Sequence, residues 1–198
     1  HLNNFKLDNL KKINLIGLKN LENKKLLNDI EKLNLENIFF LNGNEIKKLI
    51  ESNTLIENYE VFKQYPSTLN IQIERTKFLA KINQNGKLLI VGSNGKLSKT
   101  YFSDDDLPYI FGRPNVEEFL QFKKIIDESK ISYEDIESIY FFRSKRWDLK
   151  LKNNILVKLS KDHTLVSLNN AFEILNNKSF NNIEIIDVRI ENQIIING

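Results

Sequence analysis

Residues 146–159 read RWDLKLKNNILVKL, and this stretch predicts the type of fold more clearly than any other part of the chain. Its first half alternates apolar and polar side chains, as a strand does when it buries one face. The turn pair Asn153-Asn154 follows, and the same alternation returns over residues 155–159. The apolar residues of the first half are Trp147, Leu149 and Leu151. The stretch therefore predicts a β-hairpin with Trp147 in the core, beside Leu149 and a helix face that carries Phe119 or Phe172.

The flanking sequence predicts more strands and two helices. Asn115 and Glu118 form a capping-box pattern at the start of one helix, and the apolar spacing of residues 165–176 indicates the other. Asn85-Gly86 separates two apolar runs and is a strong hairpin signal. Residues 107–112 are expected to form a looser connection. The expected strands are residues 78–82, 87–91, 138–142, 186–190 and 193–197.

The first third of the chain predicts the order strand, helix, helix, strand, strand. The helices are expected at residues 22–35 and after the capping residue Asn44. Residues 69–73 alternate most clearly, with apolar side chains on one face and polar side chains on the other. The expected strands are residues 10–16, 56–62 and 69–73. Together the two parts predict an α+β fold.

Composition excludes several classes of function. The 198 residues include no Cys, which excludes disulfides, thiolate metal sites and cysteine nucleophiles. A net charge of +3 is too small to indicate a nucleic-acid groove, and no apolar run is long enough to span a membrane. The chain opens on His1 rather than Met, so we expect a piece of a longer protein.

No set of residues predicts catalysis, a metal or a cofactor. Asp104, Asp105 and Asp106 lack the spacing of a calcium loop, so we expect them to be solvated. His163 lies beside Asp162 just before a helix, where a capping role is the better interpretation. The basic residues before Trp147 favour a strand edge or an acidic protein partner over nucleic acid.

Five segments, in the same order along the chain, resemble the bacterial cell-division family FtsQ, called DivIB in other bacteria. They match its opening strand with a glycine turn, its aromatic-Pro turn with an alternating strand, its Leu-Pro-x-Leu-x-Gly motif, its Trp-x-Leu-x-Leu-x-Asn hairpin and its Val-Asp-Leu-Arg-Tyr strand. A Pro after the second segment, the Tyr of the last motif and a following Trp are absent. The segments are residues 10–18, 65–75, 107–112, 146–153 and 186–190.

The resemblance implies an N-terminal POTRA domain (β-α-α-β-β) at residues 1–76. A mostly antiparallel β-domain with two helices is then expected at residues 77–198. It further implies a single-pass protein of the bacterial inner membrane, with its membrane helix upstream of His1 and this part in the periplasm at the septum. Such proteins are non-enzymatic divisome scaffolds that bind FtsB and FtsL and help to regulate septal peptidoglycan synthesis by FtsW and FtsI. The POTRA domain would contact other divisome proteins.

The C-terminal segment is the expected partner-binding edge. Residues 193–197 are strongly strand-like, and residues 194–196 carry none of the charges, prolines or bulges that usually protect a sheet edge. The resemblance implies that a segment of FtsB adds a strand here and that its acidic residues meet nearby basic side chains. The predicted binding residues are Lys145, Arg146, Arg189, Ile190, Asn192, Ile194, Ile195 and Ile196.

Two other interpretations remain open at this point. One is a different POTRA-containing periplasmic module for outer-membrane assembly or secretion, although such proteins carry tandem POTRA units or a lipid-facing barrel. The other is an enzyme that uses Asp104–Asp106 and His163. Metal-dependent turnover lost on Asp105→Ala would support this second interpretation.

Overall fold

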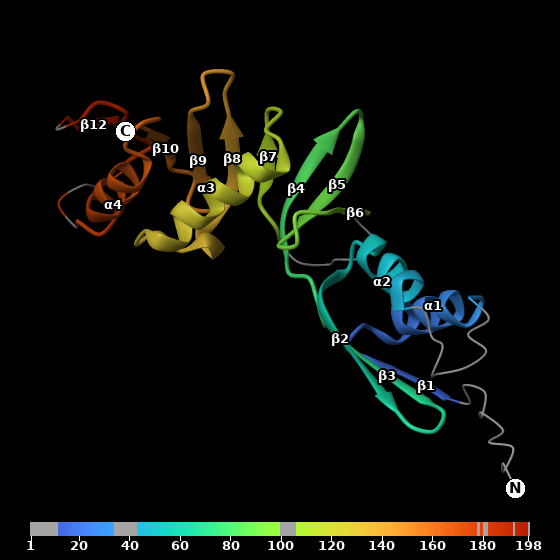
Figure 1. Cartoon of the computed structure of the whole chain (residues 1–198). Helices are drawn as coiled ribbons and strands as arrows, with labels where there is room; N and C mark the ends of the chain where they lie inside the picture. Colours follow the sequence, from blue (N-terminus) through green and yellow to red (C-terminus); the bar gives the residue numbers. More distant parts are fainter. Residues whose placement is uncertain are drawn as a thin grey trace, which may run out of the picture. The chain divides into compact units, whose positions relative to one another are not determined.

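The computed structural model divides into two compact units, residues 1–77 and 78–198, each with its own sheet and helices (Figure 1). The mixture of helices and sheets confirms the α+β fold class. The structure describes residues 12–33, 43–99, 106–177, 179, 182–191 and 193–197.

The first unit has the predicted order of strand, helix, helix, strand, strand. β3 is the central strand of its sheet and pairs in parallel with β1 and antiparallel with β2. Its elements are β1 (Lys12–Ile16), α1 (Asn20–Glu31), α2 (Gly43–Ser52), β2 (Ile56–Gln64) and β3 (Thr68–Arg75). The predicted ends at residues 10–11 and 34–35 lie outside the described residues.

The alternation in β3 explains how this unit forms a core. Leu69, Ile71 and Ile73 are buried, while the residues between them are more exposed, as the sequence predicts. Both helices contribute apolar side chains at helical spacing, and Ile30 and Ile50 are fully buried. Burial of these residues fixes the register of the three strands, because a slip by one residue would expose the apolar set.

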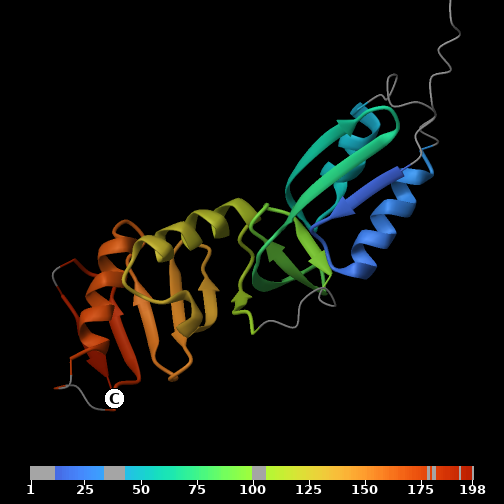
Figure 2. The same ribbon diagram turned by 90° about the horizontal axis from the view of Figure 1, so that it is seen from below.

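The second unit is built on a nine-stranded sheet in the order β12-β11-β10-β9-β8-β7-β4-β5-β6. Helices α3 and α4 lie on the same face of this sheet (Figure 2). Its elements are β4 (Phe78–Gln84), β5 (Lys87–Gly92), β6 (Leu97–Lys99), β7 (Tyr109–Phe111), α3 (Val116–Glu128), the 3₁₀ turn η2 (Tyr133–Asp135), β8 (Ile136–Phe141), β9 (Trp147–Leu151), β10 (Leu156–Leu159), α4 (Thr164–Leu175), β11 (Ile185–Val188) and β12 (Ile195–Asn197).

Most strand pairs in this sheet are antiparallel, as predicted. The antiparallel pairs are β12–β11, β10–β9, β9–β8, β4–β5 and β5–β6. The parallel pairs are β11–β10, β8–β7 and β7–β4.

One row of apolar residues crosses seven strands under the helices. Its members pair residue by residue in register: Ile82, Ile110, Ile139, Leu149, Val157, Ile186 and Ile196. Trp147 is 8% exposed, which confirms its predicted place in the core. Its ring stacks on Phe122 of α3, at 4.5 Å between centroids and 2° between planes, rather than on Phe119 or Phe172.

Three expectations about strands are wrong in detail. Residues 107–112 are not a loose connection, because β7 lies in the sheet between β8 and β4 and pairs in parallel with both. β11 ends at Val188, so Arg189 and Ile190 follow the strand rather than belong to it. β12 begins at Ile195, two residues later than expected. Pairing with neighbouring strands sets these boundaries, and alternation alone cannot fix them.

Candidate protein-binding edge

β12 is the last strand of the large sheet, and within the described ranges it pairs only with β11. The pairing joins Ile186 to Ile196 and Asp187 to Ile195. Ile196 therefore lies on the helix-covered face, whereas Ile194 and Ile195 are 41% and 42% exposed. The strand carries no charged residue and no proline. Its outer backbone is thus available for pairing with another strand.

A shallow pocket of about 310 Å³ adjoins this edge on the opposite face of the sheet. Asp187 and Ile195, which are partners in the strand pairing, contribute to it, and Ile190 at its rim is 59% exposed. Asn192, which was expected here, lies outside the described residues. The residues that line the pocket are Asp187, Arg189, Ile190, Gln193 and Ile195.

Arg189 is held in this pocket by Asp187. Its Nε and Nη2 donate to the two carboxylate oxygens at 2.8 and 2.6 Å, and its backbone N–H donates to Oδ1 at 3.2 Å. The hydrogen bonds from Arg189 lower the pKa of Asp187 below its usual range, although burial opposes them. The Arg189 side chain is 44% exposed, so a partner's carboxylate can reach it from solvent.

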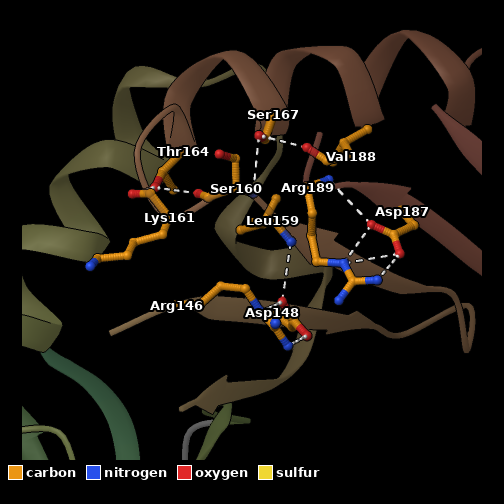
Figure 3. Close-up of polar contacts among 10 residues, drawn as sticks. All are labelled: Arg146, Asp148, Leu159, Ser160, Lys161, Thr164, Ser167, Asp187, Val188 and Arg189. Carbon is orange, nitrogen blue, oxygen red and sulfur yellow. Dashed lines mark hydrogen bonds and ion pairs between the residues drawn. The ribbon is translucent and has the colours of Figure 1, made fainter. Parts of the chain in front are cut away.

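A second Asp–Arg pair lies two strands away on the same face (Figure 3). Asp148 accepts hydrogen bonds from Arg146 Nε and Nη2 at 3.1 and 3.2 Å and from the Leu159 amide at 3.1 Å. Burial raises the pKa of Asp148, and its hydrogen bonds and the nearby Arg189 oppose that shift. The Asp148 side chain is only 4% exposed, and that of Arg146 is 24% exposed.

Lys145 lies in the turn between β8 and β9 and has an internal partner. Its ammonium group forms an ion pair with Glu118 in the first turn of α3. Its φ of 67° is in the left-handed region, which favours Gly or Asn. The Lys145 side chain remains 60% exposed. The strand order separates its turn from β12 by two intervening strands, β10 and β11.

A serine fixes the helix against the ends of β10 and β11. Ser167 of α4 donates to the Val188 carbonyl at 3.1 Å and accepts from the Ser160 amide at 3.2 Å (Figure 3). His163 stands at the start of the helix, but its side chain does not cap it, so the predicted capping role is wrong. Thr164 instead donates its hydroxyl to the Ser160 carbonyl at 3.0 Å.

The structure brings Arg146 and Arg189 to one end of the sheet, because β10 pairs with both β9 and β11. Their partners, Asp148 and Asp187, could not be assigned from alternation, which marks them only as polar residues of two strands. A signal was present in the sequence: each Asp lies two residues from an Arg, and such neighbours share one face of an extended chain.

Within the described ranges, no group of three or more His, Asp or Glu residues is placed to hold a metal ion. Asp104 and Asp105 lie outside those ranges, whereas Asp106 pairs with Lys152 at 2.8 Å. His163 Nε2 lies 3.9 Å from Glu191. None of the helices in these ranges is both long and apolar enough to cross a membrane.

Two family models match the chain. The model "POTRA domain, FtsQ-type" matches residues 9–75, and "Cell division protein FtsQ/DivIB, C-terminal" matches residues 72–189. Together they cover the first unit and most of the second.

Individual proteins are also similar to this chain. Cell division protein FtsQ of Rickettsia bellii is 26% identical over 203 residues, which cover 97% of this chain and 72% of that protein. FtsQ of Bradyrhizobium diazoefficiens is 23% identical over 171 residues, covering 80% of this chain. The chain spans about half of that relative, 48% of its length. The extracytoplasmic domain of DivIB from Geobacillus stearothermophilus is 15% identical, with a TM-score of 0.36, and matches 52% of this chain and 98% of that domain.

Proposed function

The chain belongs to the FtsQ/DivIB family of cell division proteins, and we propose that it is a non-enzymatic scaffold of the divisome. In this proposal it binds FtsB and FtsL and thereby influences septal peptidoglycan synthesis by FtsW and FtsI. It would be the periplasmic part of a single-pass inner-membrane protein that acts at the division septum. The POTRA unit would contact other divisome proteins through residues that the structure does not single out.

The observation that carries this proposal is the edge of β12, which pairs with β11 alone in the part of the chain that the structure describes. An added strand would pair with its backbone, and the exposed side chains of Ile194 and Ile195 would contact the partner on the sheet surface. Backbone pairing supplies affinity, while the adjoining pocket at Ile190 and Arg189 would select side chains at alternate positions of the partner. The edge strand has only three residues, so contacts beyond it are needed for a specific complex.

Charge supports an acidic partner segment. Arg189 is the better exposed of the two arginines, and a carboxylate from FtsB could share its guanidinium with Asp187. Arg146 would contribute more weakly, because its side chain is only 24% exposed and Asp148 binds it. Lys145 is 60% exposed, and a partner's carboxylate would share its ammonium group with Glu118. The proposed binding residues therefore divide into the strand itself and a row of basic groups that are positioned by internal carboxylates.

The backbone mechanism is tested by Ile195→Pro, with Ile195→Ala as the matched control. Proline removes a backbone donor and is poorly compatible with strand pairing, whereas alanine removes only side-chain contacts. We expect Ile195→Pro to weaken binding of the FtsB periplasmic segment tenfold or more, about 1.4 kcal/mol, and Ile195→Ala to weaken it less. Isothermal titration calorimetry on the folded variants measures their affinities for this segment. Equal affinities for the two variants would contradict strand addition.

The charge contribution is tested at Lys145. Lys145→Glu alone is ambiguous because it places a second carboxylate beside Glu118. The double variant Lys145→Glu/Glu118→Lys restores an ion pair at that position and serves as its control. Loss of FtsB affinity in the single variant with recovery in the double variant would assign the effect to local repulsion. Persistent loss in both would support direct recognition by Lys145.

A further inference from the structure

The face of the large sheet that lies opposite α3 and α4 carries aromatic and arginine side chains some distance from β12. They lie at the end of the central strands β7 and β8, where strand addition is impossible because both strands are already paired on each side. We call these residues the aromatic–arginine patch: Phe111, Arg113, Tyr140, Phe142 and Arg143.

The aromatic rings of the patch form a fixed surface. Phe111 and Tyr140 are register partners, and their rings stack at 4.9 Å between centroids and 9° between planes. The Arg146 guanidinium lies 4.2 Å from the centre of the Phe142 ring. Phe111 is nevertheless 45% exposed and Phe142 38% exposed. Rings that are positioned in advance can contact a partner with little loss of side-chain entropy.

A glycine brings the two strand ends together. Gly112 has a φ of 97°, and a Cβ on it would lie only 2.2 Å from the Phe141 carbonyl oxygen. The chain after β7 is therefore in close backbone contact with the end of β8. This approach places Arg113 and Arg143 on the same end of the sheet, next to the exposed rings.

Charge on this patch is not balanced within the described residues. Glu118 is bound to Lys145 and Asp148 to Arg146, whereas Arg113 and Arg143 are exposed and form no ion pair within those ranges. Arginines without an ion-pair partner in the described part of the chain, beside exposed aromatic rings, are the residue types that dominate binding energy at protein interfaces.

We propose that the aromatic–arginine patch docks a protein segment in which an aromatic or aliphatic side chain is flanked by acidic residues. The apolar side chain packs on Phe111 and Phe142, and the flanking carboxylates bind Arg113 and Arg143. Arg113 and Arg143, which have no ion-pair partner among the described residues, favour such a short segment over a polyanion, whose binding needs many cationic contacts. Recognition here uses side chains only, which makes the patch a second surface, independent of β12.

The probe is the blocked peptide Gly-Glu-Asp-Phe-Glu-Asp-Gly, titrated into the ¹⁵N-labelled 198-residue chain and followed by NMR. We expect shifts centred on the backbone amides of Phe111, Arg113, Phe142 and Arg143. Arg113→Glu/Arg143→Glu is expected to weaken binding at least tenfold. The control Lys87→Glu/Lys124→Glu makes the same charge change at exposed positions elsewhere and is expected to leave the affinity within about twofold.

Equal weakening in both double variants, or shifts centred on β12, would overturn the proposal. Tighter binding of polyphosphate or phosphatidylglycerol vesicles to the same residues would also overturn it, since the occupant would then be a polyanion or a membrane. If the glutamate variant does not fold, Arg113→Gln/Arg143→Gln and Phe111→Ala provide the same test. Ile195→Pro is expected to retain peptide binding here, so failure of the edge mechanism and failure of this proposal are distinguishable.

Discussion

The two faces of the large sheet differ sharply although they share the same strands. Beneath α3 and α4 the register row is uniformly apolar from Ile82 to Ile196. The row on the other face changes chemistry from strand to strand: Phe111, Tyr140, Asp148, Lys158, Asp187 and Ile195. A covered face has one physical requirement, the removal of apolar surface from water, whereas the other face is free to carry charges, rings and binding residues.

The largest loss of stability is expected for a substitution on the covered face, at Trp147. Truncation to alanine removes its stacking on Phe122 and leaves a cavity that the surrounding residues fill only in part. Trp147→Ala is therefore expected to lower the free energy of unfolding by about 3–5 kcal/mol. Urea unfolding at neutral pH measures this decrease in the free energy of unfolding.

A matched substitution on the other face sharpens this comparison. Phe111→Ala removes an aromatic ring of similar type that is 45% exposed, and its cost is expected to be well below that of Trp147→Ala. Equal losses at the two positions would mean that both faces contribute alike to stability, and the division between a structural and a binding face would be wrong.

A smaller effect is expected where β7 meets β8. Gly86 and Gly112 both have a positive φ, but nothing lies within 4 Å of a Cβ built on Gly86. Gly86→Ala therefore adds backbone strain alone, about 1–2 kcal/mol. Gly112→Ala is expected to cost at least about 1 kcal/mol more, because its Cβ would meet the Phe141 carbonyl and force overpacking. Urea unfolding of the two variants measures both losses of stability. Equal losses would contradict the close approach of Gly112 to the Phe141 carbonyl.

The sequence predicts the covered face far better than the other one. Alternation in residues 147–151 and 69–73 locates buried strands because burial imposes a period of two on each strand separately. β7 was missed since a three-residue strand between two parallel neighbours depends on pairing across the sheet rather than on its own pattern. By contrast, the start of α3 at Asn115 was predictable because it depends on a local capping box, which the structure confirms.

Binding residues were less predictable for the same reason. Exposed Ile194 and Ile195 could be proposed from the sequence as an unprotected edge, but whether they bind a partner stays a prediction. The bidentate partners of Arg146 and Arg189 depend on side-chain geometry at one end of the sheet, which no periodicity encodes. The stacking of Phe111 on Tyr140 likewise arises only once β7 has paired with β8.

The smallest predicted effects concern pH and separate two carboxylates on one face. The pKa of Asp187 is lowered, so its contribution to stability is present above the unfolded value of 3.8 and is lost as pH falls through the lower folded pKa. The pKa of Asp148 is raised, so its contribution is present below 3.8 and is lost as pH rises through the higher folded pKa.

The free energy of unfolding of the parent chain is compared with that of Asp187→Asn and of Asp148→Asn by urea unfolding between about pH 2.5 and 6. The two differences should change with pH in opposite directions. The stability of the parent chain relative to Asp187→Asn is expected to decrease on acidification, and that relative to Asp148→Asn to increase. Arg189→Gln is the control: it removes the hydrogen bonds that lower the pKa of Asp187, and it removes only a minor opposing charge near Asp148. Trends of the same sign at both aspartates would contradict this assignment, in which burial dominates the pKa of Asp148 and hydrogen bonding to Arg189 dominates that of Asp187. Opposite trends would support a pair in which Asp187 stays ionised beside Arg189 at neutral pH, so an acidic partner would share the Arg189 guanidinium with Asp187.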